Sequence, residues 1–337
     1  MLGSELRRGC RCASTLSRIS KRSTFRFAAV AGSIGLLLCS GYSAEPVPQE
    51  GSRVSITPRT VVPKRNVVTH SNLRVDVRMI LVPVTVTDPW DRPVMNLPAE
   101  SFHLFENNVE QKIVSLFREE GPVSVGFIFD SSSSMAKRMD RSIAAIHQFL
   151  NNATKGDEFF LVRFSDRATL VQGFTSDPSD ILDRLPSLQP DGWTALLDAI
   201  YLGVQQMKLA KNPRRVLFVL TDGGDNSSRY TESEMLNLIR ESDVRVFAIG
   251  LFERPRFLEK VAAESGGKAY LAHSLKDLPE TVDRLSNEMR NQYILGYYTN
   301  NPENDGKYRK VKVALSGSLP PRPLNVVWRH GYYAPLD

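Results

Sequence analysis

Three oxygen-bearing side chains follow the apolar run at residues 125–129 and could together bind a metal ion. Asp130, Ser132 and Ser134 form a D-x-S-x-S pattern, which places one carboxylate and two hydroxyls in a single turn. A short apolar run of this kind indicates a buried strand, and open α/β sheets bind ligands where their strands end. The pattern alone is a weak signal, because the intervening serines are equally suitable donors and such turns commonly cap the following helix.

Two further donors strengthen the case for a metal site. Thr194 follows Gly192 and directly precedes an amphipathic segment at residues 195–209, and Asp222 directly follows the apolar run RVLFVLT. We expect both loops to reach the same sheet edge as the first three donors. Hydroxyls and carboxylates without His or Cys suit a hard cation, and Mg²⁺ prefers near-octahedral oxygen coordination that retains several waters. We therefore predict a Mg²⁺ site, with Mn²⁺ and Ca²⁺ as the alternative ions.

Short apolar strands alternate with helical segments throughout residues 120–291. The predicted strands cover residues 125–129, 159–164, 169–174, 215–220, 244–249 and 269–271, and the predicted helices cover residues 141–150, 195–209, 232–241, 257–264 and 275–291. Such alternation produces a mostly parallel sheet with helices on both of its faces. We therefore predict a doubly wound, Rossmann-like α/β domain whose sheet carries the candidate donors at its carboxyl edge.

The segments on either side of this domain have the period of two that is typical of half-buried strands. Residues 73–119 and 292–337 each contain too few strands for a core of their own, so we predict that they pair into one antiparallel β-sandwich. The α/β domain would then be an insertion in that sandwich. The alternation of apolar residues changes phase at residues 80–82, which predicts a β-bulge or a bend, and Pro83 favours an edge position.

The first 44 residues have the composition of a signal peptide. Seven basic residues precede an apolar run at residues 27–38, which is shorter than the roughly 20 residues of a membrane span. We expect cleavage between Gly41 and Ala44, with an uncleaved N-terminal anchor or a lipoprotein signal at Cys39 as alternatives. Residues 45–72 indicate an extended linker. The expected location is therefore outside the cell, in the periplasm or in the cell envelope.

The charge and the cysteines of the chain are concentrated in this leader. Residues 1–44 hold 7 of the 43 Lys and Arg residues and 1 of the 37 Asp and Glu residues, so the rest has 36 of each sign. A neutral mature chain argues against a nucleic-acid partner, which requires a basic surface. All 3 cysteines also fall in the leader, so the mature protein is expected to be stabilised by its core without disulfides.

The candidate donors lie in segments that resemble the metal-ion-dependent adhesion site of von Willebrand factor A domains. The resemblance covers roughly residues 123–291 and rests on FIFDSSSSM, GWTALLDAI and VLFVLTDGGDNSSR, in this order. The flanks resemble the VWFA-related acidobacterial domain proteins in LVPVTVTD, FHLFENNVEQKIVSLF, QYILGYY and RHGYY. All five motif positions are filled. The resemblance implies that Ser132, Ser134 and Thr194 bind the metal directly, whereas Asp130 and Asp222 act mainly through waters and hydrogen bonds.

The function that these observations predict is metal-dependent protein binding or adhesion by an exported module. Neutral hydroxyl ligands leave the ion much of its charge, so that an Asp or Glu of a partner protein can complete its coordination. A membrane contact is expected only through an uncleaved export signal. Two alternatives remain at this stage: a structural scaffold of the cell envelope without metal-dependent binding, and a metal-assisted hydrolase.

An enzyme is the less favoured interpretation. The 5 histidines are scattered, neither H-E-x-x-H nor G-x-S-x-G occurs, and no residue has an evident role in proton transfer at the ion. We expect four further carboxylates to be solvent-exposed, and only the last of them to lie near enough to the predicted site to affect its charge: Asp157, Glu158, Asp166 and Asp225.

Overall fold

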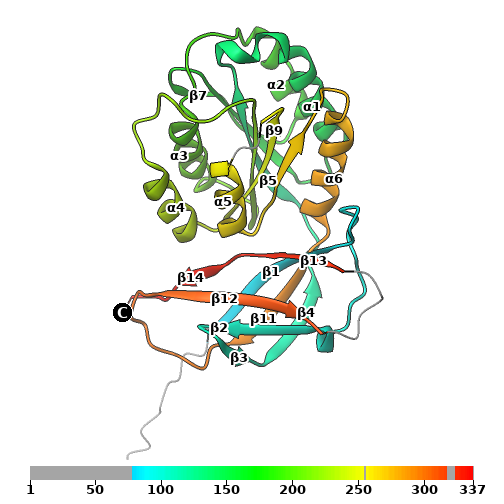
Figure 1. Cartoon of the computed structure of the whole chain (residues 1–337), viewed down its shortest axis with the longest axis vertical. Helices are drawn as coiled ribbons and strands as arrows, with labels where there is room; N and C mark the ends of the chain where they lie inside the picture. The colour runs from blue at the N-terminus through cyan, green and yellow to red at the C-terminus, as the bar shows by residue number, and fades with distance from the viewer. Residues whose placement is uncertain (1–77, 254–255, 317–322, 337) are drawn as a thin grey trace, which may run out of the picture. The chain divides into compact units, whose positions relative to one another are not determined.

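The computed structural model describes residues 78–253, 256–316 and 323–336 (Figure 1). All of these belong to the second of two compact units of the chain, Asn72–Asp337. The predicted signal peptide and linker lie outside the described residues. Within the described ranges, no helix combines the length and the apolar character that crossing a membrane requires.

A six-stranded, mostly parallel sheet forms the centre of the α/β unit in the described part of the chain. Its strands, in spatial order, are β10 (Ala269–Ala272), β9 (Val244–Leu251), β8 (Arg214–Thr221), β5 (Val123–Asp130), β6 (Glu158–Phe164) and β7 (Ala168–Thr175). Only the pairing of β6 with the edge strand β7 is antiparallel. β5 and β9 are buried along their whole length, as expected for strands that helices cover on both faces.

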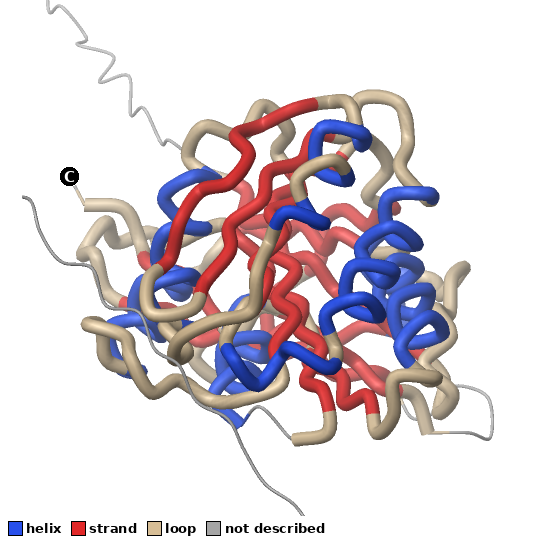
Figure 2. Tube along the Cα trace, turned by 90° about the horizontal axis from the view of Figure 1, so that it is seen from above, coloured by secondary structure: helices blue, strands red, loops and turns tan. Residues whose placement is uncertain are grey.

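Two apolar clusters lie on the two faces of this sheet. The helices are α1 (Met139–Asn151), α2 (Pro178–Leu182), α3 (Leu196–Met207), α4 (Glu232–Glu241), α5 (Arg256–Ser265) and α6 (Leu278–Arg290). One cluster includes buried side chains of α1, α2 and α6, and the other includes those of α3, α4 and α5. Figure 2 shows helices on both sides of the strands. This arrangement is the predicted doubly wound α/β fold.

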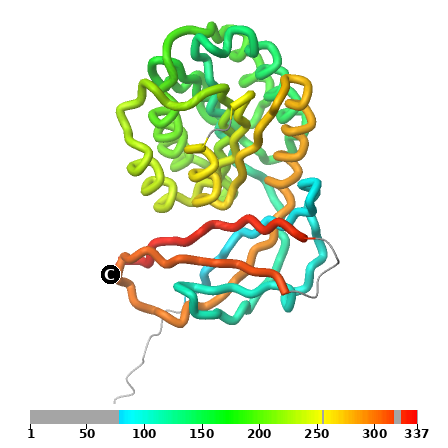
Figure 3. Tube along the Cα trace, viewed as in Figure 1, coloured from blue at the N-terminus to red at the C-terminus, as the bar shows by residue number. Residues whose placement is uncertain are grey.

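The flanking segments pair into two four-stranded sheets, as counted within the described residues. The first sheet has the order β13 (Asn325–Trp328), β1 (Met79–Thr87), β11 (Tyr293–Tyr298) and β4 (Ile113–Arg118), and the second has the order β14 (Gly331–Tyr333), β12 (Tyr308–Leu315), β2 (Phe102–Glu106) and β3 (Val109–Gln111). Early strands thus lie beside late ones, as the colours in Figure 3 show. One apolar core joins the two sheets, and Phe102 packs against Tyr293 with ring centroids 5.2 Å apart. The α/β unit is therefore inserted in a β-sandwich, as predicted.

The predicted bulge near residues 80–82 is wrong. The pairs of β1 with β11 follow one another without interruption from Met79 to Val84. The irregularity lies instead in the pairing of β11 with β4, where the partners of Gly296 and Tyr297 are Ser115 and Ile113, so that one residue of β4 is skipped. The change of phase in the sequence has a simpler cause. The apolar side chains of Met79 and Leu81, which suggested a buried odd-numbered series, are 38% and 52% exposed. The buried apolar side chains of β1 therefore belong to one even-numbered series, Val82, Val84 and Val86, so no bulge is needed to turn the strand over, although Thr85 and Thr87 on the other face are buried as well.

The expectation that Pro83 marks an edge strand is also wrong. β1 lies between β11 and β13. Pro83 is tolerated there because it pairs only with Ile294 of β11, whereas the ladder with β13 begins one residue later, at Val84. The missing N–H of the proline therefore costs β1 no bond on the β13 side.

Two carboxylates that were expected to be exposed are buried at the amino-terminal end of the central sheet. Asp157 and Glu158 are 2% and 6% exposed. Asp157 accepts hydrogen bonds from the backbone N–H groups of Val123 and Thr154 at 2.9 and 2.8 Å, and pairs with Arg290 of α6 at 2.7 Å. Asp157 thus ties the start of β5 to the last helix.

Replacing Asp157 with Asn is expected to lower the free energy of unfolding by about 2 kcal/mol or more, because buried donors lose their acceptor and Arg290 loses its partner. Burial alone would raise the pKa of Asp157, but the bonds from Arg290, Thr154 and Val123 outweigh it and lower that pKa. The stabilisation is therefore present above the ordinary carboxyl pKa and is lost as the pH falls through the lowered one.

Urea unfolding of the wild type and D157N, from neutral to strongly acidic pH, measures this difference. The matched control is D183N, because Asp183 is exposed. Equal midpoints for D157N and the wild type at neutral pH would show that Asp157 has no such role.

Candidate metal centre

Three of the predicted donors are placed by two adjacent parallel strands. Asp130 is the last residue of β5, and Asp222 directly follows β8. These strands pair in parallel up to Phe129 and Leu220, so the two carboxylates emerge side by side at the carboxyl edge of the sheet. Ser132 is the N-cap of the short helix η2 (Ser133–Lys137), which follows β5 directly.

Hydrogen bonds join these side chains into one group. The hydroxyls of Ser132 and Ser134 lie 3.1 Å apart, and the Ser134 hydroxyl donates to Oδ1 of Asp222 at 2.7 Å. Asp130 accepts from the backbone N–H of Ser132 at 2.8 Å through Oδ1 and from the Thr221 hydroxyl at 2.5 Å through Oδ2. The two carboxylates and the two serine hydroxyls therefore face one small volume.

The loop that carries Thr194 joins this group through its backbone. The N–H of Ser133 donates to the carbonyl of Gly192 at 3.1 Å, which links the serine loop to the threonine loop. The N–H of Thr194 donates to Oδ1 of Asn226 at 2.8 Å, and the N–H of Asn226 donates back to the Thr194 carbonyl at 3.0 Å. Thr194 is thus fixed between the loop after β5 and the loop after β8.

The structure also distinguishes among the four consecutive serines. The Ser131 hydroxyl donates to the carbonyl of Phe164 on β6 at 3.1 Å and so has a structural role within the sheet. Ser133 is exposed, and its backbone N–H joins the threonine loop instead. Ser132 and Ser134 are therefore the two hydroxyls available to a ligand at this edge.

Gly192 has the backbone conformation on which the threonine loop depends. Its φ is +69°, and a Cβ added there would lie 2.6 Å from the carboxyl group of Asp166. Asp166 in turn accepts a hydrogen bond from the backbone N–H of Trp193 at 2.7 Å. Asp166, like Asn226, supports the loop rather than the predicted donors themselves, and both were missed because their partners are backbone groups distant in sequence.

The site is rich in buried negative charge. Asp130 is 0% exposed and the side chain of Asp222 is 1% exposed. Burial raises the pKa of Asp130, although hydrogen bonds from Ser132 and Thr221 and the charge of Arg138 act in the opposite direction. A cation placed here would stabilise both carboxylates.

The donor set fits a hard cation held largely by neutral oxygens. Within the described ranges, no three His, Cys, Asp or Glu side chains form a group that could hold a metal ion. An ion at this edge would therefore rely on hydroxyls and waters in addition to two carboxylates, which is the oxygen chemistry that suits Mg²⁺.

One residue of the site, Arg138, was not predicted. Its guanidinium group contacts the carboxylate of Asp222, donates to the Ser134 carbonyl at 3.0 Å, and lies 4.8 Å from the ring centroid of Phe252. The available sequence signal was its spacing, because Arg138 lies four residues after Ser134 in the turn that leads into α1. Nothing in the sequence shows that this turn directs the side chain back to Asp222.

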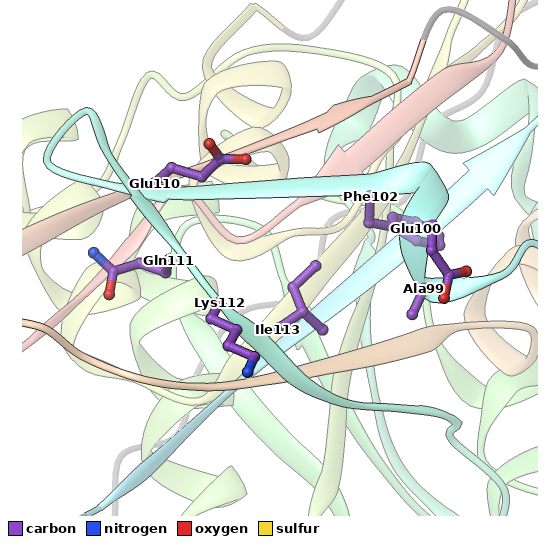
Figure 4. A pocket seen from close by; sticks show the side chains of 7 residues that line it. All are labelled: Ala99, Glu100, Phe102, Glu110, Gln111, Lys112 and Ile113. Atoms are coloured by element: carbon purple, nitrogen blue, oxygen red, sulfur yellow. The ribbon is translucent and has the colours of Figure 1, made fainter.

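The sandwich contains a hollow of about 470 Å³ that has no comparable chemistry. Its lining residues, labelled in Figure 4, comprise two glutamates, one lysine and one glutamine among apolar side chains: Ala99, Glu100, Phe102, Glu110, Gln111, Lys112 and Ile113. Glu110 is already paired with His103 at 2.8 Å. We therefore place the candidate site at the carboxyl edge of the central sheet.

We expect Asp130→Asn to leave the metal-free protein as stable as the wild type, or more stable, at neutral pH. Asn can accept from the Ser132 N–H and donate to the Thr221 hydroxyl, so both hydrogen bonds survive without a buried charge. Because the pKa of Asp130 is raised in the fold, the carboxylate costs stability as the pH rises from its ordinary pKa through the raised one.

Thermal unfolding in EDTA, compared at acidic and neutral pH, measures this effect. Asp222→Asn serves as the contrast, since it removes the partner of Arg138 and is expected to destabilise the metal-free protein. A melting temperature of D130N well below that of the wild type at neutral pH would contradict the expectation.

Residues 125–224 match the sequence model of the von Willebrand factor type A domain, and all five predicted donors lie within this segment. The chain is 24% identical over 213 residues to inter-alpha-trypsin inhibitor heavy chain H4 of Homo sapiens, a match that covers 57% of this chain and 23% of the human protein. An uncharacterized protein of Borreliella burgdorferi is 25% identical over 160 residues, or 46% of each chain.

Among solved structures, the von Willebrand factor type A protein from Catenulispora acidiphila aligns with a TM-score of 0.47 and 14% identity, covering 70% of this chain and 74% of that one. The chain spans less than a quarter of the length of the human heavy chain that it matches. The match over residues 125–224 therefore supports a von Willebrand factor type A-like domain in the inserted α/β unit.

Proposed function

We propose that this chain is an exported protein-binding module that holds a divalent cation at the carboxyl edge of its α/β domain. Ser132, Ser134 and Thr194 would bind the ion through their hydroxyls, and Asp130 and Asp222 would act through waters and hydrogen bonds. Mg²⁺ is the expected ion, with Mn²⁺ and Ca²⁺ as alternatives. Export rests on the signal-peptide composition of residues 1–44.

The observation that carries this proposal is the convergence of hydroxyls and buried carboxylates at one point. Ser134 donates to Asp222 at 2.7 Å and lies 3.1 Å from the Ser132 hydroxyl, directly beside the fully buried Asp130. Two buried carboxylates at one sheet edge are costly unless a cation compensates them. Arg138 pairs directly with Asp222, whereas the direct partners of Asp130 are the neutral donors of Ser132 and Thr221, which supports a further cation at this edge.

The division of roles among the five donors supports a binding function. A divalent cation bound there would offer a vacant or water-filled position to a carboxylate of a partner. The serine and threonine hydroxyls carry no charge, and both carboxylates already accept hydrogen bonds from within the chain. The ion would therefore be incompletely neutralised by the protein, which favours an additional anionic ligand.

The surface around the site favours a protein partner. Trp193, which precedes Thr194, is 67% exposed, and Phe252, which contacts Arg138, is 44% exposed. Exposed aromatic side chains next to a polar anchor are typical of the central residues of protein interfaces. We therefore infer that the partner is a protein that presents an Asp or Glu, rather than a small substrate to be transformed.

Replacing both Ser132 and Ser134 with Ala is expected to lower Mg²⁺ affinity by roughly tenfold or more, because two neutral ligands are lost. Isothermal titration calorimetry with Mg²⁺, Mn²⁺ and Ca²⁺ measures this loss. The matched control is Ser133→Ala, which alters the same turn at an exposed serine and is expected to leave affinity unchanged. Equal affinity in the double variant and the wild type would argue for a scaffold without this metal site.

The binding function is tested by pull-down from the exported protein fraction of the source cells. We expect a partner that the wild type retains in Mg²⁺ and releases in EDTA, and that Asp130→Ala does not retain. Retention that is indifferent to EDTA and to the substitution would contradict metal-dependent binding.

A further inference from the structure

The guanidinium group of Arg138 lies where it neutralises the most buried part of the candidate site. It contacts Oδ2 of Asp222, whose side chain is 1% exposed, and its own side chain is 29% exposed. The same guanidinium nitrogen donates to the Ser134 carbonyl at 3.0 Å. Arg138 therefore supplies positive charge to a carboxylate that is almost cut off from water.

This contact places a positive charge on a carboxylate that a metal ion would need. Oδ1 of Asp222 accepts from the Ser134 hydroxyl, and Oδ2 accepts from Arg138, so both oxygens of the carboxylate are engaged. Each carboxylate oxygen can accept a second hydrogen bond, so Arg138 and a metal-bound water compete for Asp222 through charge and not through a shortage of acceptor sites. Repulsion between a divalent cation and a guanidinium on the same buried carboxylate favours the loss of the Arg138 contact.

Phe252 gives the guanidinium group a second contact at the rim of the site. The ring centroid lies 4.8 Å from the central carbon of Arg138, and this position suits a cation–π interaction. Phe252 has a φ of +70°, which is unusual for a bulky residue, and its N–H donates to the Ala272 carbonyl at 3.0 Å. The backbone of Phe252 is thus anchored beside the site, and its ring can remain in contact with Arg138 when the contact with Asp222 opens.

We propose that Arg138 is an internal counter-ion that occupies Asp222 in the metal-free protein and competes with the divalent cation for it. This inference rests on the proposed metal site. Arg138 keeps the metal-free domain stable and weakens metal binding, so that the site fills only when the ion is abundant or when a partner's carboxylate adds to the binding. Arg138 is thus the residue that sets the metal affinity of the site.

The test compares Arg138→Gln with Lys137→Gln. Both substitutions remove one positive charge from the same turn, but the side chain of Lys137 is exposed, so K137Q controls for the general loss of charge. We expect R138Q to bind Mg²⁺ roughly tenfold more tightly than the wild type by calorimetry, and to melt at a lower temperature in EDTA. K137Q is expected to match the wild type in both measurements.

A third variant covers the case in which R138Q does not fold. Arg138→Lys retains the charge but loses the planar guanidinium group, which contacts Phe252 and bonds to both Asp222 and Ser134. The Mg²⁺ affinity of R138K is therefore expected to lie between that of the wild type and that of R138Q. If the wild type binds Mg²⁺ and neither R138Q nor R138K binds it more tightly, the counter-ion role is overturned and the metal site stands. Absence of Mg²⁺ binding in the wild type and in every variant would overturn the metal site and the counter-ion role together.

Discussion

Asp130 and Asp222 lie side by side because the strands that precede them are adjacent and parallel, and both carboxylates are removed from water. Two negative charges in such a place require compensation, and the surrounding residues supply it in parts. Serine and threonine side chains donate to the carboxylates, and Arg138 brings a positive charge. The proposed divalent cation would neutralise the two carboxylates more fully than these groups do. We therefore expect metal binding to raise the free energy of unfolding of the domain.

The rest of the fold keeps that edge in register. The buried strands β5 and β8 place the two carboxylates side by side. Backbone hydrogen bonds join the loop with Thr194 to the loops that follow these two strands. At the opposite end of the sheet, Asp157 ties the start of β5 to α6 through Arg290. The chain enters and leaves the α/β domain at neighbouring points, where the N–H of Glu119 donates to the carbonyl of Gln292 at 3.0 Å. Insertion in the sandwich thus closes the domain at the end away from the candidate site.

Periodic patterns and strand-end residues were sufficient to predict the doubly wound sheet, its insertion in a sandwich and the loops that carry the candidate donors. They failed where a side chain has a distant partner. Asp157 has the sequence context of an exposed turn, but its partners Val123 and Arg290 come from other elements. The contact of Arg138 with Asp222 could not be predicted from the sequence either, because it depends on the direction in which the arginine side chain points. The change of phase at Met79 and Leu81 predicted a bulge, whereas both side chains are exposed.

The central claim is that five side chains, distant in sequence, hold one cation at this sheet edge. Anomalous diffraction at the manganese absorption edge, from crystals soaked in Mn²⁺, tests it most directly. We expect a single strong peak within coordination distance of the hydroxyls of Ser132, Ser134 and Thr194, with the carboxylates of Asp130 and Asp222 in the next shell of neighbours. A soaked crystal with no peak at these hydroxyls, or with its peak elsewhere on the molecule, would contradict it.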